Sequence, residues 1–170
     1  ETTENCIENL RLSVGAKQFA SDSINTLVNA EAKVHGKSIN EVHLHEAGFV
    51  DTPAEIVGAA VALEDLNFFN TKVYSTPIAV GGGLFKFSHG TVSSPAPATI
   101  EVLRSKGFSM IGGPVESELA TPTGASLLVN LAQEVIRFYP LMKPMVIGYG
   151  AGTKDFVEMP NVIRITLGEP

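Results

Sequence analysis

Residues 52–83 read TPAEIVGAAVALEDLNFFNTKVYSTPIAVGGG, and this stretch decides the fold class. Its first half begins with helix-start signals: Thr52 can act as the N-cap, Pro53 suits the first helical position, and Glu55 completes a capping box. We expect this helix to run to about Leu66 and to be buried, because apolar residues occupy almost every side of it. The second half is rich in β-forming residues and ends in three glycines, which predicts a strand after the helix.

Helical and extended patterns alternate in the same way along the rest of the chain. We expect further helices over residues 4–35 (with a break near Gly15), 95–106 and 121–137. We expect strands over residues 39–44, 71–80, 84–89, 108–111, 144–149 and 161–167. This interleaving predicts an α/β or mixed α+β fold, in which one sheet has helices packed on its faces. A chain of 170 residues has the usual size of one domain, so we expect a single domain over residues 1–170.

The composition excludes some classes of function. With 12 Lys and Arg against 18 Asp and Glu, the net charge is −6, and no basic cluster is present to bind the phosphates of a nucleic acid. No run approaches the roughly 20 apolar residues of a membrane span. Cys6 is the only cysteine, so no internal disulfide can form, which fits a reducing compartment and leads us to expect a cytoplasmic protein.

Three of the four histidines lie within residues 35–45, close to carboxylates. His43 and His45 flank one leucine, so they point to the same face if the segment is extended. Glu46 follows directly, and imidazole together with carboxylate is a ligand set for nickel, zinc, cobalt or manganese. We therefore predict a metal site at His43, His45 and Glu46. The alternative is a strand whose polar face is simply exposed or satisfied by hydrogen bonds.

Two neighbouring features have both a structural and a functional interpretation. Asp51 and Glu55 stand at a predicted helix start, where carboxylates cap the helix and offset its dipole. They could instead orient the imidazole of His43 or His45 by accepting a hydrogen bond from its ring N–H. His89 ends a predicted strand before a proline-rich loop, so it is either a core residue with a satisfied ring or a residue that faces a ligand. Asp51 and His89 are therefore our candidates for substrate binding.

Residues 121–124, Thr-Pro-Thr-Gly, place two hydroxyl groups and free backbone N–H groups at a predicted helix start. This arrangement can bind a phosphate, and the alternative is an ordinary N-cap. We predict that Thr121, Thr123 and Gly124 bind the phosphate of a substrate. Neither a Gly-x-x-x-x-Gly-Lys-Ser/Thr motif nor a Gly-x-Ser-x-Gly motif occurs, so the sequence predicts neither a P-loop nor a hydrolase nucleophile.

Five stretches of the chain form an ordered set that covers most of it from residue 30 onward. They are AEAKVHG (30–36), HLHEAGFVD (43–51), HG (89–90) with PAPAT (95–99), ELATPTGA (118–125), and GYGAG (148–152) with PN (160–161). This set resembles the nickel insertion proteins of the LarC family, which act in the nickel-pincer nucleotide pathway. Three residues depart from the family pattern: Glu55 replaces an aspartate, and Ser93 and Ser94 replace a Pro-Val pair.

The resemblance implies an activity: insertion of nickel into pyridinium-3,5-bisthiocarboxylic acid mononucleotide, coupled to hydrolysis of CTP with Mn²⁺ or Mg²⁺. Such an enzyme is a nickel-inserting cyclometallase, classed as a lyase, and its small-molecule partner is the nucleotide. The histidine pair could carry the nickel, and the helix start at Thr121 could hold the nucleotide phosphate. Glu46 or Asp51 could place a carboxylate near the thiocarboxylates.

The resemblance also implies a longer protein. The family's glycine-rich N-terminal segment and its C-terminal, CTP-associated domain have no counterpart in residues 1–170, so we expect this chain alone to be inactive. Self-association of the chain is left open. Two other classes compete with the enzyme: a non-enzymatic metal chaperone or scaffold, and a purely structural module. Nucleotide-dependent turnover separates the enzyme from the chaperone, and stoichiometric metal retention separates the chaperone from the structural module.

Overall fold

The computed structural model describes residues 7–41, 51–87 and 90–170. The helices are α2 (Val14–His35), α3 (Asp51–Asp65), α4 (Pro97–Lys106) and α5 (Pro122–Leu131), with 3-10 turns η1 (Ile39–Glu41) and η2 (Phe68–Asn70). The strands are β1 (Tyr74–Ser75), β2 (Ile78–Ala79), β3 (Leu84–Phe87), β4 (Gly90–Ser93), β5 (Met110–Ile111), β6 (Glu134–Val135), β7 (Lys143–Ala151) and β8 (Val162–Glu169). The mixed α/β class predicted from the sequence is confirmed.

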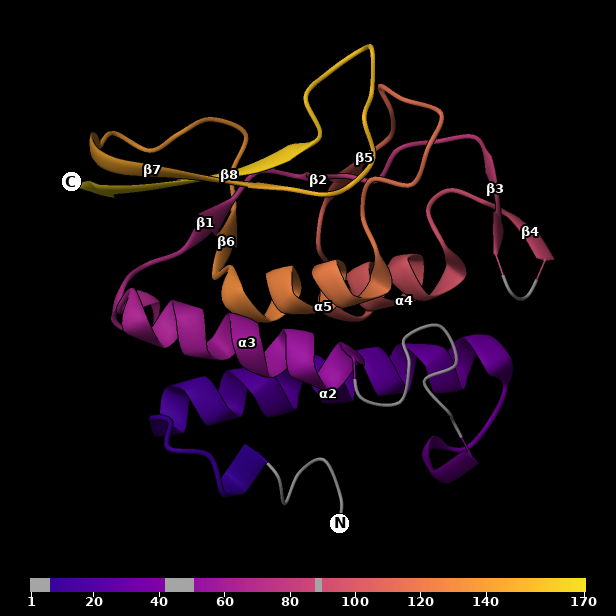
Figure 1. Ribbon diagram of the computed structural model, residues 1–170, viewed down its shortest axis with the longest axis horizontal. Coiled ribbons are helices and arrows are strands. Elements are labelled where there is room, and N and C mark those ends of the chain that lie inside the picture. The colour runs from indigo at the N-terminus through magenta and orange to yellow at the C-terminus, as the bar shows by residue number, and fades with distance from the viewer. Residues whose placement is uncertain (1–6, 42–50, 88–89) are drawn as a thin grey trace.

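The helices and the strands occupy opposite sides of the molecule (Figure 1). Helix α2 packs against α3, α4 and α5, and α4 also packs against α5. Helix α4 begins at the right of the view, near the end of α2, whereas α3 and α5 begin closer to the middle, and all three run towards the left (Figure 1). No described helix is both long enough and apolar enough to cross a membrane.

Two apolar clusters hold the helices and strands together. The first joins α2 to α3 and η2 through Ile7, Phe19, Ala20, Ile24, Ile56, Ala60, Leu63 and Phe68. The second joins the segment after β2 to α2, α4 and α5 through Ala30, Val80, Val102, Leu103, Ala120, Ala125 and Val129. The second cluster therefore fixes the starts of α4 and α5 relative to the strands that precede them.

Helix α2 is set by its caps. The side chain of Ser13 accepts a hydrogen bond from the N–H of Ala16, and Gly36 ends the helix with a left-handed φ of 61°. The sequence predicted one broken helix over residues 4–35 with the break near Gly15. The break instead falls before Ser13, because the Ser13 cap starts a new helix and leaves Gly15 inside its first turn.

Helix α3 corrects two predictions. It begins at Asp51, so Thr52 lies inside the first turn and is not the N-cap. Its buried hydroxyl has no hydrogen-bond partner among the described residues. The helix is also buried on one face only: Ile56 is fully buried, whereas Val61 is 47 % exposed. Small residues such as Gly58 made the outer face seem apolar in the sequence, although they have little side chain to bury.

Two further expected elements differ from the structure. Helix α5 ends at Leu131, short of residue 137, because residues 134–135 pair with β1 as strand β6. The expected strand 39–44 is a 3-10 turn over Ile39–Glu41, where the Glu41 carboxylate accepts hydrogen bonds from the N–H and hydroxyl of Ser38. Residues 42–44 lie outside the described part of the chain.

The strands form four pairs. Strand β1 pairs in parallel with β6, and β2 pairs in parallel with β5, while β3–β4 and β7–β8 are antiparallel hairpins. Within the described residues these pairs are separate two-stranded sheets, so the predicted single sheet with helices on its faces is not what the structure shows. Pro77 lies between β1 and β2 and has no N–H to donate, which explains why the extended segment 71–80 is split.

Candidate functional site

Two glycine-rich turns meet at the carboxyl ends of the parallel strands β2 and β5. The carbonyl of Gly81 accepts a hydrogen bond from the N–H of Gly113 (3.1 Å), and the N–H of Gly82 donates to the carbonyl of Ser117 (3.3 Å). Gly81 has a φ of +78°, and a Cβ there would lie 1.8 Å from the Ser117 oxygen, so only glycine fits. Ligands of α/β proteins commonly bind at this edge of a parallel sheet.

Helix α5 starts just beyond these turns, at the predicted phosphate site. The Thr121 hydroxyl accepts a hydrogen bond from the N–H of Gly124 at 3.1 Å, and the Thr121 carbonyl accepts from the N–H of Ala125 at 2.9 Å. Pro122 has no N–H, so in this first turn the N–H of Thr123 is the one for which the described residues supply no acceptor. Thr121 thus forms the ordinary N-cap that was the alternative, and phosphate binding stays a prediction.

Thr121 and Gly124 are nevertheless accessible at the surface. Both are exposed, and Thr123 is half-buried. A Cβ on Gly124 would lie 3.3 Å from the Thr121 hydroxyl oxygen, so a larger residue would crowd the cap. The cap therefore depends on both residues, while the Thr121 hydroxyl hydrogen remains available to donate to a ligand.

Lys154 brings a positive charge to the segment that leads into α5, and the sequence analysis missed it. Its ammonium group donates to the Ser117 hydroxyl (3.3 Å) and to the Glu118 carbonyl (3.4 Å). The Asn161 side-chain amide donates to the Lys154 carbonyl (3.0 Å), which holds the loop between β7 and β8 in this position. Lys154 and Glu118 are 36 residues apart, so no local sequence pattern predicts their contact.

The other predicted site residues are placed only in part. Asp51 is the first residue of α3 and is exposed, and α3 contacts α5. His43, His45, Glu46 and His89 lie outside the described residues, so the metal site stays a prediction. In residues 7–41, 51–87 and 90–170, no group of three or more His, Cys, Asp and Glu side chains could hold a metal ion.

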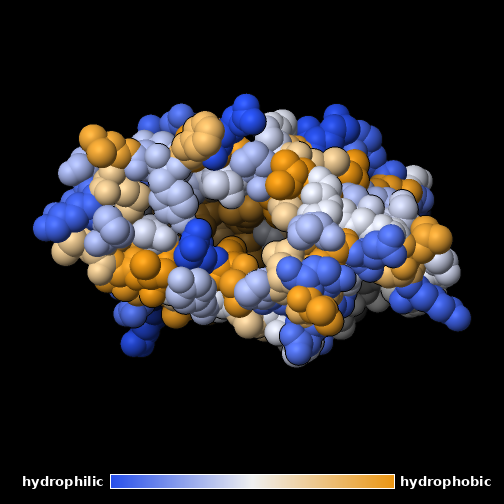
Figure 2. Space-filling view, turned by 90° about the horizontal axis from the view of Figure 1, so that it is seen from above, coloured by the Kyte–Doolittle hydropathy of each residue, from blue (hydrophilic) through white to orange (hydrophobic). Residues whose placement is uncertain are grey.

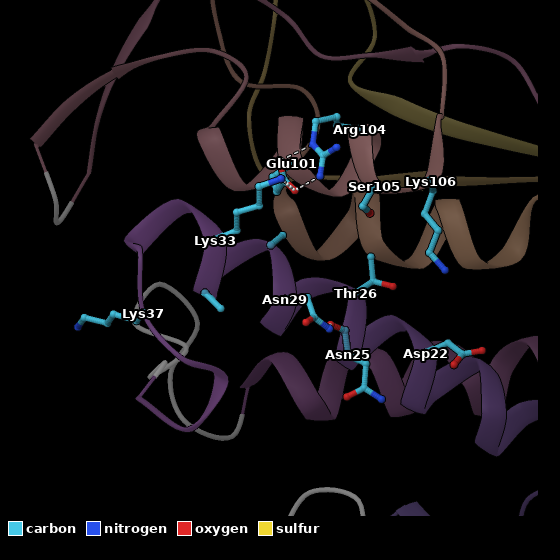
Figure 3. A pocket seen from close by; sticks show the side chains of 12 residues that line it. Asp22, Asn25, Thr26, Asn29, Lys33, Lys37, Glu101, Arg104, Ser105 and Lys106 are labelled. Atoms are coloured by element: carbon cyan, nitrogen blue, oxygen red, sulfur yellow. Dashed lines mark hydrogen bonds and ion pairs between the residues drawn. The ribbon is translucent and has the colours of Figure 1, made fainter.

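A polar cleft of about 710 Å³ opens between α2 and α4 (Figure 3). Four cationic side chains line it, namely Lys33, Lys37, Arg104 and Lys106. Asp22 and Glu101 supply opposing charges. No local sequence pattern joins these residues, because α2 and the segment after it lie far from α4 in the sequence.

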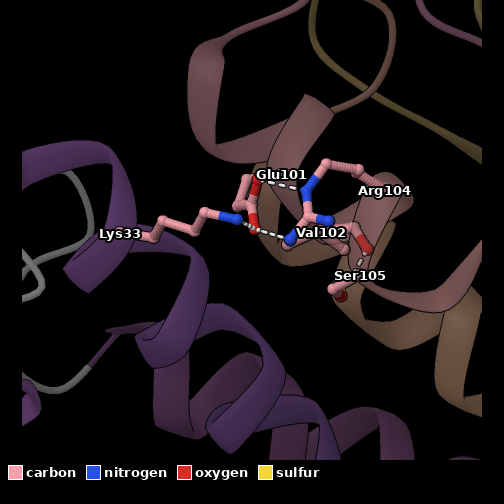
Figure 4. Close-up of polar contacts among 5 residues, drawn as sticks. All are labelled: Lys33, Glu101, Val102, Arg104 and Ser105. Carbon is pink, nitrogen blue, oxygen red and sulfur yellow. Dashed lines mark hydrogen bonds and ion pairs between the residues drawn. The ribbon is translucent and has the colours of Figure 1, made fainter.

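Glu101 is the centre of the ion pairs in this cleft (Figure 4). Its carboxylate lies 3.0 Å from the Lys33 ammonium, and Arg104 donates to both oxygens at 2.6 and 2.8 Å. The hydrogen bonds from Arg104 and then Lys33 lower the pKa of Glu101 to about 2. Glu101 therefore stays ionised near neutral pH and cannot exchange a proton there, so we interpret this network as a structural link between α2 and α4.

Comparison with known proteins gives one consistent result. A model of the family described as nickel insertion protein matches residues 1–170. A putative nickel insertion protein of Methanothermobacter thermautotrophicus is 47 % identical over 171 residues, which cover 95 % of this chain and 41 % of that protein. The pyridinium-3,5-bisthiocarboxylic acid mononucleotide nickel insertion protein of Geobacillus kaustophilus is 40 % identical over 165 residues, covering 96 % of this chain and 38 % of that protein.

The chain thus spans about two fifths of the length of these curated relatives. A putative nickel insertion protein of Methanosphaera stadtmanae shows the same relation, with 46 % identity over 82 % of this chain and 34 % of its own length. No solved structure matches the chain.

Proposed function

Because residues 1–170 belong to the nickel insertion protein family, we propose that this chain helps to insert nickel into pyridinium-3,5-bisthiocarboxylic acid mononucleotide. The family match over the whole chain carries the proposal, and the name of the Geobacillus relative supplies the nucleotide. In the complete reaction the protein acts as a nickel-inserting cyclometallase that uses CTP with Mn²⁺ or Mg²⁺. Nickel is the substrate that is transferred rather than a resident cofactor.

Nickel is proposed to pass through His43, His45 and Glu46. Imidazole and carboxylate suit Ni²⁺, and no thiolate from Cys6 is needed. The histidine-bearing segment leads directly into α3, and α3 contacts α5, the helix proposed to hold the nucleotide phosphate. This contact supports a transfer of nickel from the histidines to a nucleotide bound at α5.

The nucleotide phosphate is proposed to bind at the start of α5. The N–H of Thr123, the hydroxyl of Thr121 and the positive end of the helix dipole all favour an anion there. Gly124 has no side chain to crowd the Thr121 hydroxyl. The ammonium group of Lys154 donates to the Ser117 hydroxyl in the segment that leads into α5. Phosphate binding by the first turn requires only a small change, because Thr121 can keep its bond from Gly124 while donating its own hydrogen.

Asp51 and His89 are proposed to face the rest of the nucleotide. A pyridinium ring is positively charged, so the exposed carboxylate of Asp51 complements it, whereas the same carboxylate would repel the phosphate. The two charges of the substrate thus favour different ends of the site, with the phosphate at α5 and the ring towards α3.

CTP hydrolysis is proposed to require polypeptide outside residues 1–170. The chain has no P-loop motif, and phosphoryl transfer needs a phosphate cradle, a divalent cation and nearby positive charge. The absence of that motif favours a second candidate function for the chain by itself, which is to bind nickel and pass it on without nucleotide chemistry.

The test uses a chimera in which residues 1–170 replace the matched region of the Methanothermobacter thermautotrophicus relative. The chimera is incubated with Ni²⁺, CTP, Mg²⁺ and the bisthiocarboxylate mononucleotide, and mass spectrometry measures the nickelated product. We expect His43→Ala with His45→Ala to abolish product formation. The matched control is His35→Ala, because His35 pairs with Glu31 at 3.4 Å on α2 and has no proposed role in the site. Full activity of the double variant would show that these histidines do not carry the nickel.

A further inference from the structure

The hairpin of β7 and β8 leaves large apolar side chains exposed along its whole length. Strand β7 has nine residues and β8 has eight, and no described helix packs closely against either. The exposed apolar residues are Met145, Val146, Ile147, Tyr149, Val162, Ile163, Ile165 and Leu167. A two-stranded hairpin in water is marginally stable at best, and stability usually requires further strands or a packed face.

The register assigns these residues to two different faces. Residues directly opposite each other in an antiparallel pair share a face. Val146 pairs with Leu167, Gly148 with Ile165, and Gly150 with Ile163, and these three pairs form what we call the apolar face. This face carries no polar or charged side chain.

The opposite face of the hairpin is mixed in character. Tyr149 pairs with Arg164 and Ile147 with Thr166. Tyr139 lies against this region, with its hydroxyl 3.5 Å from the Thr166 hydroxyl and its ring 5.9 Å from the Arg164 guanidinium. The polar groups of this second face thus already have interactions within the chain.

The apolar face is also uneven, with exposed isoleucine side chains on β8 beside glycines on β7. Ile163 and Ile165 are 59 % and 42 % exposed, and each stands beside a glycine on β7. A Cβ on Gly148 would meet nothing within 4 Å, so Gly148 leaves open space beside Ile165, whereas the Ile163 side chain lies against Gly150, where a Cβ would be 3.1 Å from it. Figure 2 looks down on this side and shows apolar residues, in orange, at the left where the hairpin lies and around a hollow near the centre.

The size of the face decides which kind of partner fits. Strands of this length cover roughly 27 Å by 10 Å, or about 270 Å². A stable complex between separate proteins buries about 800 Å² on each side, so this face is too small to hold a second copy by itself. A segment of the same polypeptide needs far less area, because the covalent link gives it an effective concentration in the millimolar range.

We propose that, in full-length proteins of this family, polypeptide outside the matched region packs apolar side chains onto the face formed by Val146, Ile163, Ile165 and Leu167. The curated relatives supply such polypeptide, since more than half of their length lies outside the match. The occupant fills the space at Gly148 and excludes water from Ile163 and Ile165. This inference goes beyond nickel insertion and does not depend on it.

Hydrogen exchange of the β7 and β8 amides tests the proposal. The free 170-residue chain is compared with the chimera that carries the rest of the Methanothermobacter thermautotrophicus relative. We expect these amides to exchange at least about 100-fold more slowly in the chimera, because the occupant must leave before the hairpin opens. Within the chimera, Ile163→Thr combined with Ile165→Thr should restore fast exchange. The matched control is Val157→Thr, which changes a fully exposed residue in the loop between the strands.

Each other outcome overturns the proposal. Equal exchange in the free chain and the chimera would mean that nothing from the added polypeptide covers the face. Slow exchange in the free chain, accompanied by a doubled mass in sedimentation, would show that a second copy covers it. Slow exchange that survives both isoleucine substitutions in the chimera would place the occupant elsewhere. None of these readouts involves nickel or nucleotide, so they stand apart from a failure of the insertion assay.

Discussion

The helical side of the molecule and the C-terminal hairpin contain apolar residues of the same kinds, but the helices bury them and the hairpin leaves them exposed. Ile56 on α3 and Val102 on α4 are fully buried between helices. Ile163 and Ile165 on β8 are exposed, although their strand is one of the two longest in the structure. A regular hairpin can therefore form even where its apolar side chains are not buried. The helices bury theirs against one another within the described residues, whereas we propose that further polypeptide covers those of the hairpin.

The largest expected effect contrasts one isoleucine from each region. Ile56→Ala should lower the free energy of unfolding by about 2–5 kcal/mol, because it opens a cavity in a filled core. Ile163→Ala in the 170-residue chain should cost less than about 0.5 kcal/mol, as is usual for a surface substitution. Urea denaturation followed by circular dichroism measures both. Equal costs would break the comparison, because they would show that the hairpin is already packed.

The next contrast uses two glycines. Gly81→Ala should cost about 3 kcal/mol or more, because it combines a left-handed φ with a collision against the Ser117 carbonyl. Gly58→Ala on α3 should raise stability by about 0.5–1 kcal/mol, since open space surrounds it and alanine favours a helix. Thermal unfolding of the two variants should shift in opposite directions. A neutral Gly81→Ala would mean that the turn at the end of β2 is loose.

Two helix caps separate a structural role from a role in binding. Thr121→Ala and Ser13→Ala each remove a side-chain cap and should each cost about 1 kcal/mol. If α5 holds the nucleotide phosphate, Thr121→Ala should also weaken binding of the mononucleotide, while Ser13→Ala leaves it unchanged. Isothermal titration with the mononucleotide provides the measurement. Unchanged affinity in both variants would reduce Thr121 to an ordinary cap.

The smallest expected effect concerns the ion pairs between α2 and α4. The pKa of Glu101 is lowered from 4.5 to about 2 by Arg104 and Lys33, so the charged form contributes stability above about pH 4.5. That contribution should fade as the pH drops from 4.5 towards 2 and Glu101 takes up a proton in the folded state. Glu101→Gln should therefore flatten the stability profile in this window. If the two profiles have the same slope there, the ion pairs do not contribute.

The sequence predicted best those elements whose signals are local. The end of α4 before Gly107 and the two C-terminal strands follow from glycine and from alternating apolar residues, and α4 starts at Pro97, two residues after the expected start at 95. The end of α5 could not be predicted from local signals, because residues 134–135 leave the helix only to pair with β1, 60 residues earlier. The prediction that α3 is buried on all sides was wrong, because alanine and glycine count as apolar in a sequence pattern even where they are exposed.

The candidate site shows the same limit. The residue types at Thr121 and Thr123 indicated a helix start, and the structure confirms the cap. Lys154 reaches this region only because the loop between β7 and β8 folds back over Ser117, which a one-dimensional pattern does not contain. The cleft between α2 and α4 likewise arises from tertiary packing of two separate helices.

Titration of Ni²⁺ into the 170-residue chain measures whether His43 and His45 bind the metal. We expect one Ni²⁺ per chain for the wild type and loss of that binding in the variant with both His43→Ala and His45→Ala. Binding should also weaken below about pH 6, because an imidazole must lose its proton to ligate a metal. The His35→Ala control should bind as the wild type does. Equal nickel binding by the wild type and the double variant would show that these histidines are not nickel ligands.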